Sequence, residues 1–190
     1  MAKAFVEKNP EFTFVETRIS KVYAELGLDP KVMYPFAKRL EIQRRILDEL
    51  VNQYREGGLL FIADRTPIDF IAYTLADIVR DNYQGEQDGE LSTYINDCYD
   101  VTNTYFSMIL VVQPGIKAEE SALKAPANLG YMEHINNLVL GLSTDRRLNS
   151  MHFALNRETV DLDTRVGAIE NALRLCHTRV RERERIKVLH

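Results

Sequence analysis

Residues 59–75 read LLFIADRTPIDFIAYTL, and this stretch predicts how the chain folds. Its first five residues form an apolar run between Gly-Gly and Asp64-Arg65, a pattern typical of a buried strand in a parallel sheet. Thr66 is a suitable N-cap for a following helix, and the proline after it fits the first helical position, where a missing N–H costs nothing. The stretch therefore predicts a strand, a tight loop and a helix.

Asp64 and Arg65 are the first candidates for a functional site, because they follow the predicted strand directly. Open α/β sheets bind their ligands at the carboxyl ends of the strands. Arginine offers a forked donor for phosphate, and aspartate can hold a metal-bound water or accept a hydroxyl proton. The alternative is an Asp–Arg pair that only ties the strand end to a neighbouring element.

The composition of the chain excludes several classes of protein. Its 190 residues are enough for one domain with a sizeable core, and the net charge of −4 gives no general attraction to nucleic acid or membrane. The apolar runs are too short to span a bilayer, and the first residues do not form a signal peptide. Cys98 and Cys176 indicate neither a disulfide framework nor a zinc site. We therefore expect a cytoplasmic protein.

Strand and helix patterns alternate along the whole chain. This alternation predicts a single α/β domain over residues 1–190, with a mainly parallel sheet flanked by helices. The expected strands are 12–16, 59–63, 107–112 and 151–155. The expected helices are 1–8, 19–26, 35–55, 67–81, 91–103, 131–142 and a last one starting at Asp161 or Asp163.

Three further groups of polar residues are candidates, each with a structural alternative. Glu16 and Arg18 come at the end of the first strand, where a parallel sheet would bring them to the same edge as Asp64. A solvated loop is the alternative. Gln43 on the long helix 35–55 could present its amide to a base, although glutamine on such a helix is more often polar surface.

The third group lies in the charged stretch 114–127, which contains Lys117 and Lys124. Cations on a mobile lid can close over phosphates and exclude water. An ordinary charged loop is the alternative.

Together these elements resemble the P-loop nucleoside and nucleotide kinases, especially phage-type deoxynucleoside monophosphate kinases and related AAA-like ATP-binding proteins. The resemblance runs over most of the chain, and its most specific part is DRxPxDxxAY at 64–73. It also rests on the helix with Gln43, on the charged stretch and on three further segments, which are VETR at 15–18, SMILVVQP at 107–114 and HFALNRETVDLDTRV at 152–166.

The resemblance implies a three-layer fold that transfers the γ-phosphoryl group of ATP to a deoxynucleoside monophosphate. Glu16 would be a base or a substrate-orienting carboxylate, Arg65 would hold the substrate phosphate, and Asp64 would be a Walker-B-like group near Mg²⁺. The implied substrate-binding residues are Arg18, Gln43, which would read the base, Arg44, Asp69 and Tyr73. Lys117 and Lys124 would belong to the lid, and Asn156 and Arg157 would lie near the adenine of ATP.

The sequence departs from this family in one respect. It contains no GxxxxGK[ST] motif, whose backbone N–H groups and lysine hold the ATP phosphates. By the resemblance, the chain would begin just after that loop and would lack the central strand before it. Unpaired strand edges would then cost stability or invite a partner. Three explanations remain. The chain could be a truncated or internally started product, it could descend from a kinase and have abandoned phosphoryl transfer, or another chain could supply a stand-in strand.

Three functional hypotheses follow from the sequence. The first is a nucleotide kinase that binds a small nucleotide, with ATP and Mg²⁺ implied by the resemblance. The second is a non-catalytic nucleotide-binding or protein-interaction module, in which another copy or a partner covers the open sheet edge. The third is a structural or assembly protein that reuses the fold.

Overall fold

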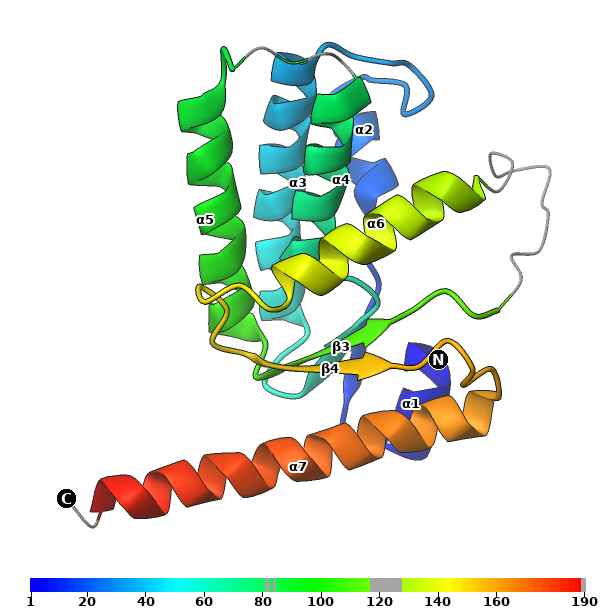
Figure 1. Cartoon of the computed structure of the whole chain (residues 1–190), viewed down its shortest axis with the longest axis vertical. Coiled ribbons are helices and arrows are strands. Elements are labelled where there is room, and N and C mark those ends of the chain that lie inside the picture. The colour runs from blue at the N-terminus through cyan, green and yellow to red at the C-terminus, as the bar shows by residue number, and fades with distance from the viewer. Residues whose placement is uncertain (81–82, 84, 117–127, 189–190) are drawn as a thin grey trace.

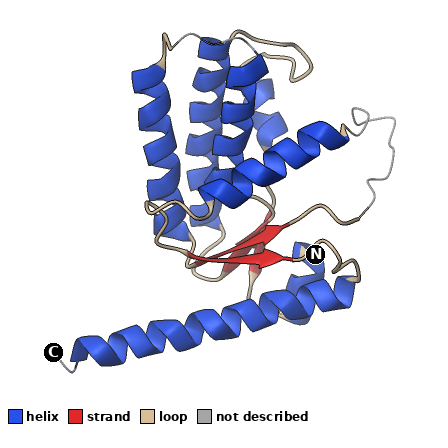
Figure 2. Cartoon of the chain, in the orientation of Figure 1, coloured by secondary structure: helices blue, strands red, loops and turns tan. Residues whose placement is uncertain are grey.

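The computed structural model describes residues 1–80, 83, 85–116 and 128–188 (Figure 1). Helices dominate the described chain, and the strands are short (Figure 2). The elements in order are α1 (Ala2–Lys8), β1 (Thr13–Val15), α2 (Ile19–Glu25), α3 (Phe36–Glu56), β2 (Phe61–Ala63), α4 (Pro67–Arg80), α5 (Asp88–Tyr105), β3 (Met108–Val112), α6 (Leu129–Leu142), β4 (Met151–Leu155) and α7 (Leu162–Val188).

The α/β class predicted from the sequence is confirmed, and the helices cover both faces of the strands. Figure 1 shows α3, α4, α5 and α6 on one side of β3 and β4, and α7 with α1 on the other side. On the side of α1 and α7, Ile62 of β2 and Leu110 of β3 pack against a cluster of Phe5, Val166 and Ile169. The strands therefore form the middle layer of three.

The expectation of one mainly parallel sheet is wrong in a specific way. The strands that the structure describes form two separate parallel pairs, β1 with β2 and β3 with β4. In the first pair Val15 lies opposite Ala63, and in the second Val112 lies opposite Leu155. No hydrogen bond between described residues joins β2 to β3. The direction of pairing was predictable from the sequence, whereas the break between the pairs was not.

The predicted start of α4 is confirmed, and its contacts show how it is held. The Asp69 carboxylate accepts hydrogen bonds from the backbone N–H of Thr66, at 2.8 Å, and from the Thr66 hydroxyl, at 3.2 Å. A side chain in the first turn thus satisfies the N–H group just before the helix, as in one half of a capping box. This local bond fixes the loop that carries Asp64 and Arg65.

Element boundaries differ from the expectations by a few residues. The strand expected at 59–63 begins only at Phe61, which lies opposite Thr13 at the start of β1. Leu59 is fully exposed and Leu60 is half exposed. The helix expected at 91–103 is longer, since α5 begins at Asp88 and ends at Tyr105. The end of α2 agrees with the glycine signal, because Gly27 follows it with a φ of 64°, a conformation that favours glycine.

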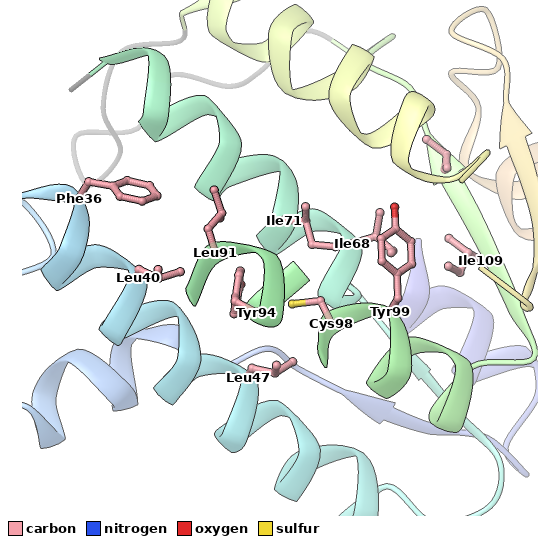
Figure 3. Close-up of a cluster of buried hydrophobic side chains, with 11 residues drawn as sticks. Phe36, Leu40, Leu47, Ile68, Ile71, Leu91, Tyr94, Cys98, Tyr99 and Ile109 are labelled. Atoms are coloured by element: carbon pink, nitrogen blue, oxygen red, sulfur yellow. The ribbon is translucent and has the colours of Figure 1, made fainter. Parts of the chain in front are cut away.

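The main core lies between α3, α4 and α5 and reaches β3 (Figure 3). Tyr94, Cys98 and Tyr99 of α5 are completely buried or nearly so, and they belong to one cluster with Leu40 and Ile71. Removing such apolar surface from water is the main favourable term in folding. This core anchors α4 and so positions the loop between β2 and α4.

Two expectations about the class of protein can be compared with the structure. Cys98 and Cys176 are both buried and free. Among the described helices, none combines the length and the apolar character that crossing a bilayer requires.

Candidate functional site

A cavity of about 720 Å³ lies between β2 and β3. Residues 59–66 line it from the side of β2, and residues 105–112 line it from the side of β3. Its charged lining residues, among those described, are Asp64, Arg65 and Asp69, and the ring of Tyr73 lines it as well. Four of the sequence-predicted residues are therefore brought together at the carboxyl end of β2.

Asp64 is fixed by the neighbouring strand end. Its Oδ1 accepts hydrogen bonds from the backbone N–H of Thr17, at 3.1 Å, and from the Thr17 hydroxyl, at 2.6 Å. The pairing of Val15 with Ala63 brings these residues side by side. Asp64 thus ties the strand end to a neighbour, as the structural alternative proposed, but its partner is Thr17 and not Arg65. Asp64 is exposed, and its Oδ2 accepts no hydrogen bond from a described residue.

Arg65 is half-buried and makes no ion pair with any residue of the described chain. Its guanidinium carbon lies 5.8 Å from the centre of the Tyr73 ring, within cation–π range. The backbone carbonyl of Arg65 accepts a hydrogen bond from the hydroxyl of buried Tyr54, at 3.3 Å. The backbone is therefore held from the core while the guanidinium keeps its donors for an anion.

Burial dominates the electrostatics of the two α4 residues beside Arg65. It raises the pKa of the Asp69 carboxyl above its usual range, against the hydrogen bonds from Thr66 and the charge of Arg65. Burial likewise raises the pKa of the Tyr73 hydroxyl, which the charge of Arg65 opposes. A cation next to a buried carboxyl helps to keep it ionised. Arg65 is therefore the positive group of this part of the cavity.

Glu16 and Arg18 lie at the same sheet edge as Asp64, as predicted, but they do not line the cavity. Both are exposed. The Glu16 carboxylate is 3.8 Å from the ammonium of Lys3, and more than half of each side chain is exposed. Pairs of this kind contribute little to stability, so Glu16 is free to turn towards a ligand. Its catalytic role stays a prediction, as does substrate binding by Arg18.

Gln43 and Arg44 lie on α3 and are not among the residues that line the cavity. Arg44 joins α3 to α5 through hydrogen bonds to the Glu90 carbonyl, at 2.8 Å, and to the Asp97 carboxylate, at 3.3 Å. The Gln43 Oε1 is buried without a hydrogen-bond partner among the described residues. Arg44 thus has a structural function, and substrate binding by either residue stays a prediction.

The residues predicted near adenine follow β4. Asn156 is exposed and accepts a hydrogen bond from the backbone N–H of Glu158, at 3.2 Å. Arg157 donates both guanidinium prongs to the Glu133 carboxylate of α6, one of them at 2.6 Å, and also contacts Gln113 at 3.4 Å. Arg157 is thus already engaged with an anion. The two predicted lid residues, Lys117 and Lys124, lie outside the described residues.

The fit of the implied cofactors differs between magnesium and ATP. Magnesium is commonly held by one or two carboxylates together with substrate phosphates and waters. The free Oδ2 of Asp64 suits one such ligand position, and the described chain contains no cluster of three or more potential metal ligands. The sequence provides no GxxxxGK[ST] loop for the triphosphate, so no phosphoryl-transfer step follows from these residues.

The sequence interpretation missed two polar residues of this region. Thr17 lies two residues beyond the end of β1, as Arg65 lies two residues beyond the end of β2. This equal spacing could have indicated that Thr17 reaches the same edge of the sheet, where it contacts Asp64. Asn136 of α6 lines the cavity, is buried, and its Nδ2 has no partner among the residues that the structure describes. It shares a helical face with Met132 and Val139, at spacings of four and three.

Comparison of the chain with family models, with curated proteins and with solved structures gave no match. The resemblance to nucleotide kinases therefore rests on the sequence segments alone. The site brings three groups to one cavity: a guanidinium with no ion pair among the described residues, a fixed carboxylate and an aromatic ring. This arrangement is suited to binding an anion that carries a planar or apolar group.

Proposed function

We propose that the chain is a nucleotide-kinase-like α/β protein whose cavity binds the phosphate of a small nucleotide at Arg65. The observation that carries the proposal is the half-buried Arg65 guanidinium, which has no ion pair within the described chain. A partly buried cation is stabilised when an opposite charge accompanies it. A phosphate ligand supplies that charge and accepts the two parallel hydrogen bonds of the guanidinium fork.

The resemblance narrows the ligand to a deoxynucleoside monophosphate. In this interpretation Arg65 holds the phosphate, the Tyr73 ring keeps the guanidinium oriented, and Asp64 lies at the position for a magnesium ligand. Glu16 would orient the acceptor or take its proton. We expect the 190 residues to bind the nucleotide without phosphorylating it, because they contain no GxxxxGK[ST] loop for ATP.

Isothermal titration with the four deoxynucleoside monophosphates, the matching nucleosides and inorganic phosphate tests this proposal. The monophosphates should bind more tightly than the nucleosides, and raised salt should weaken their binding. Arg65→Ala should lower the affinity about 10- to 100-fold, as expected for the loss of a charged hydrogen bond worth about 1.5–3 kcal/mol. Arg45→Ala is the matched control, because Arg45 is an exposed arginine of α3 that does not line the cavity.

Two results would contradict phosphate binding at Arg65. One is equal affinity for a nucleoside and its monophosphate. The other is an Arg65→Ala variant that folds, by circular dichroism, and binds the monophosphate as the unchanged chain does.

A non-catalytic interaction module is the second candidate function. The observation that favours it is the pair of strands, β2 and β3, that line the cavity without pairing with each other. Calorimetry with ATP and deoxynucleotides, combined with sedimentation, separates the candidates. Nucleotide binding by a monomer favours the first, and a partner-dependent assembly without nucleotide binding favours the second.

A further inference from the structure

The cavity between the two sheets is bounded by one strand from each. Every residue of β2 and every residue of β3 lines it, whereas no residue of β1 or β4 does. Each of the two lining strands is paired on its far side, β2 with β1 and β3 with β4. The cavity therefore lies between two strand edges whose described backbone groups make no hydrogen bond across it. Such edges are templates for pairing with a further strand.

Apolar side chains cover this space from above and below. Residues Met132, Ile135 and Val139 of α6 line it from one helical layer. Ile169 and Leu173 of α7 line it from the other layer, together with Met1 and Phe5. A strand between β2 and β3 would thus be buried on both faces, as the strands of parallel sheets are, and would need a nearly continuous apolar sequence.

The exposure of β2 is unusual for a strand in the middle layer. Phe61, Ile62 and Ala63 are all only half-buried. Leu59, just before the strand, is fully exposed, and Leu60 is half exposed. All five residues line the cavity. Their apolar surface would be removed from water if the space were filled, which stabilises a bound segment by roughly 25 cal/mol per Å².

Asn136 marks a polar position among the apolar α6 residues that line this space. Only 7% of its surface is exposed, it lines the cavity, and its Nδ2 has no hydrogen-bond partner among the described residues. An unsatisfied buried amide is costly, so an occupant with an acceptor oxygen at this point is favoured. A serine or threonine hydroxyl on the side of α6 supplies such an oxygen.

We propose that this cavity is a docking slot for one extended apolar segment of a partner polypeptide, which pairs with β2 on one side and with β3 on the other. The length of β3 sets the segment at about five residues. A residue with a hydroxyl group faces Asn136. A second copy of the chain is a poorer occupant, because each described strand is already paired and could be donated only by breaking its own pair. This slot deepens the second candidate function, an interaction module, and it lies in the same cavity as the proposed phosphate site at Arg65.

The test uses the full chain and the synthetic peptide Lys-Lys-Val-Ile-Thr-Val-Leu, in which two lysines provide solubility. Hydrogen exchange measured by mass spectrometry reports on the amides of β2 and β3. At saturation we expect at least about tenfold slower exchange in both strands. The melting temperature should rise by roughly 5 to 10 °C when the peptide is about 100-fold above its Kd. Protection in only one strand, or in neither, overturns the proposal.

A second peptide with proline in place of isoleucine separates backbone pairing from apolar filling of the cavity. Proline lacks the N–H that pairing needs. The proline peptide should give neither protection nor stabilisation. Equal effects of both peptides would overturn the proposal in favour of a cavity that accepts any apolar molecule. Sedimentation of the chain alone tests whether a second copy fills the slot. A dimer in which β2 and β3 are already protected from exchange would also overturn the proposal.

Two neighbouring asparagines of α6 test the polar position. Asn136 is buried in the slot lining, whereas Asn137 is exposed and does not line it. In the unchanged chain the threonine peptide should bind at least about fivefold more tightly than a peptide with valine at that position, as expected for one hydrogen bond of about 1 kcal/mol. Asn136→Leu should abolish this preference and Asn137→Leu should preserve it. A preference that survives Asn136→Leu contradicts the role given to Asn136.

Discussion

Arg65 and Arg157 occupy equivalent positions in the two halves of the molecule, each two residues beyond the end of a parallel strand. Arg65 stacks on the Tyr73 ring and has no ion pair within the described chain. Arg157 is held by both oxygens of Glu133. The same residue type at the same place is thus available for a ligand in one half and serves as a structural link in the other. Whether the arginine is available or engaged depends on the acidic side chain of the neighbouring helix.

The acidic residues of the two helices explain this difference. Near Arg65, the Asp69 carboxylate of α4 accepts hydrogen bonds from Thr66 and caps its own helix. Near Arg157, the Glu133 carboxylate of α6 accepts hydrogen bonds from the arginine itself. These local hydrogen bonds hold the Asp69 carboxylate at the start of its own helix, where the charge of Arg65 still acts on it. Four predictions test this comparison, beginning with the largest expected effect.

The loops of the two halves should tolerate a methyl group differently. A Cβ at Gly115 would overlap the backbone oxygen of Arg157, whereas one at Gly57 would lie 2.6 Å from a side-chain methyl of Val15. Gly115→Ala should therefore lower the free energy of unfolding by about 3 kcal/mol, and Gly57→Ala by about 1 kcal/mol, within the range of overpacking. Urea denaturation measures both. An equal cost at the two sites would show that the Gly115 loop moves freely away from Arg157.

Substitution of the two arginines should separate binding from structure. Arg65→Lys should weaken binding of a deoxynucleoside monophosphate by about tenfold, because lysine keeps the charge and loses the forked geometry. Arg157→Ala should leave this affinity unchanged and cause only a small fall in the melting temperature. Titration calorimetry and thermal unfolding distinguish the two effects. A loss of nucleotide affinity in Arg157→Ala would contradict the view that Arg65 binds the ligand while Arg157 is only structural.

Asp69 should contribute to stability mainly as a cap. Asp69→Ala should lower the free energy of unfolding by about 1 kcal/mol, whereas Asp69→Asn keeps an acceptor for Thr66 and should cost less. Burial raises the Asp69 pKa in the folded chain above its ordinary 3.8, so the folded state holds this proton more tightly than the unfolded state does. Stability from this group therefore falls as pH rises from the ordinary pKa to the raised one.

Urea denaturation across that pH range provides the measurement for Asp69. The Asn variant should lose this part of the pH dependence, with the exposed Asp48→Asn as a control that keeps it. An unchanged pH profile in Asp69→Asn would mean that another group is responsible.

Glu133→Gln should have the smallest effect on stability, because both members of its ion pair are partly exposed. Arg157 holds the Glu133 pKa below its usual range, so the stabilisation is present above the ordinary glutamate pKa and is lost as pH falls through the lowered value. The variant should therefore show a shallower loss of stability in acid. It should also release Arg157, so that salt-sensitive phosphate binding appears in an Arg65→Ala background. If no such binding appears, the carboxylate partner is not the only difference between Arg65 and Arg157.

Part of this site was predictable from short stretches of sequence. The apolar run before Asp64 placed that residue at a strand end, and the Thr66–Asp69 spacing predicted the start of α4. The partners were not predictable. Thr17 lies 47 residues from Asp64, and Glu133 lies 24 residues from Arg157. Such contacts depend on strand register and on helix orientation, which no local spacing contains.

The sequence by itself determined the α/β class, the order of the elements and the placement of Asp64 and Arg65 after β2, because hydrophobic periodicity and capping act within a few residues. Only the tertiary structure decided that the strands form two pairs, that a cavity with unpaired edges lies between them, and that Arg157 is engaged while Arg65 is not. Pairing between strands and burial of polar groups are set by contacts between segments far apart in the chain. The same principle places Asn136, an ordinary polar residue in the sequence, at the wall of the slot.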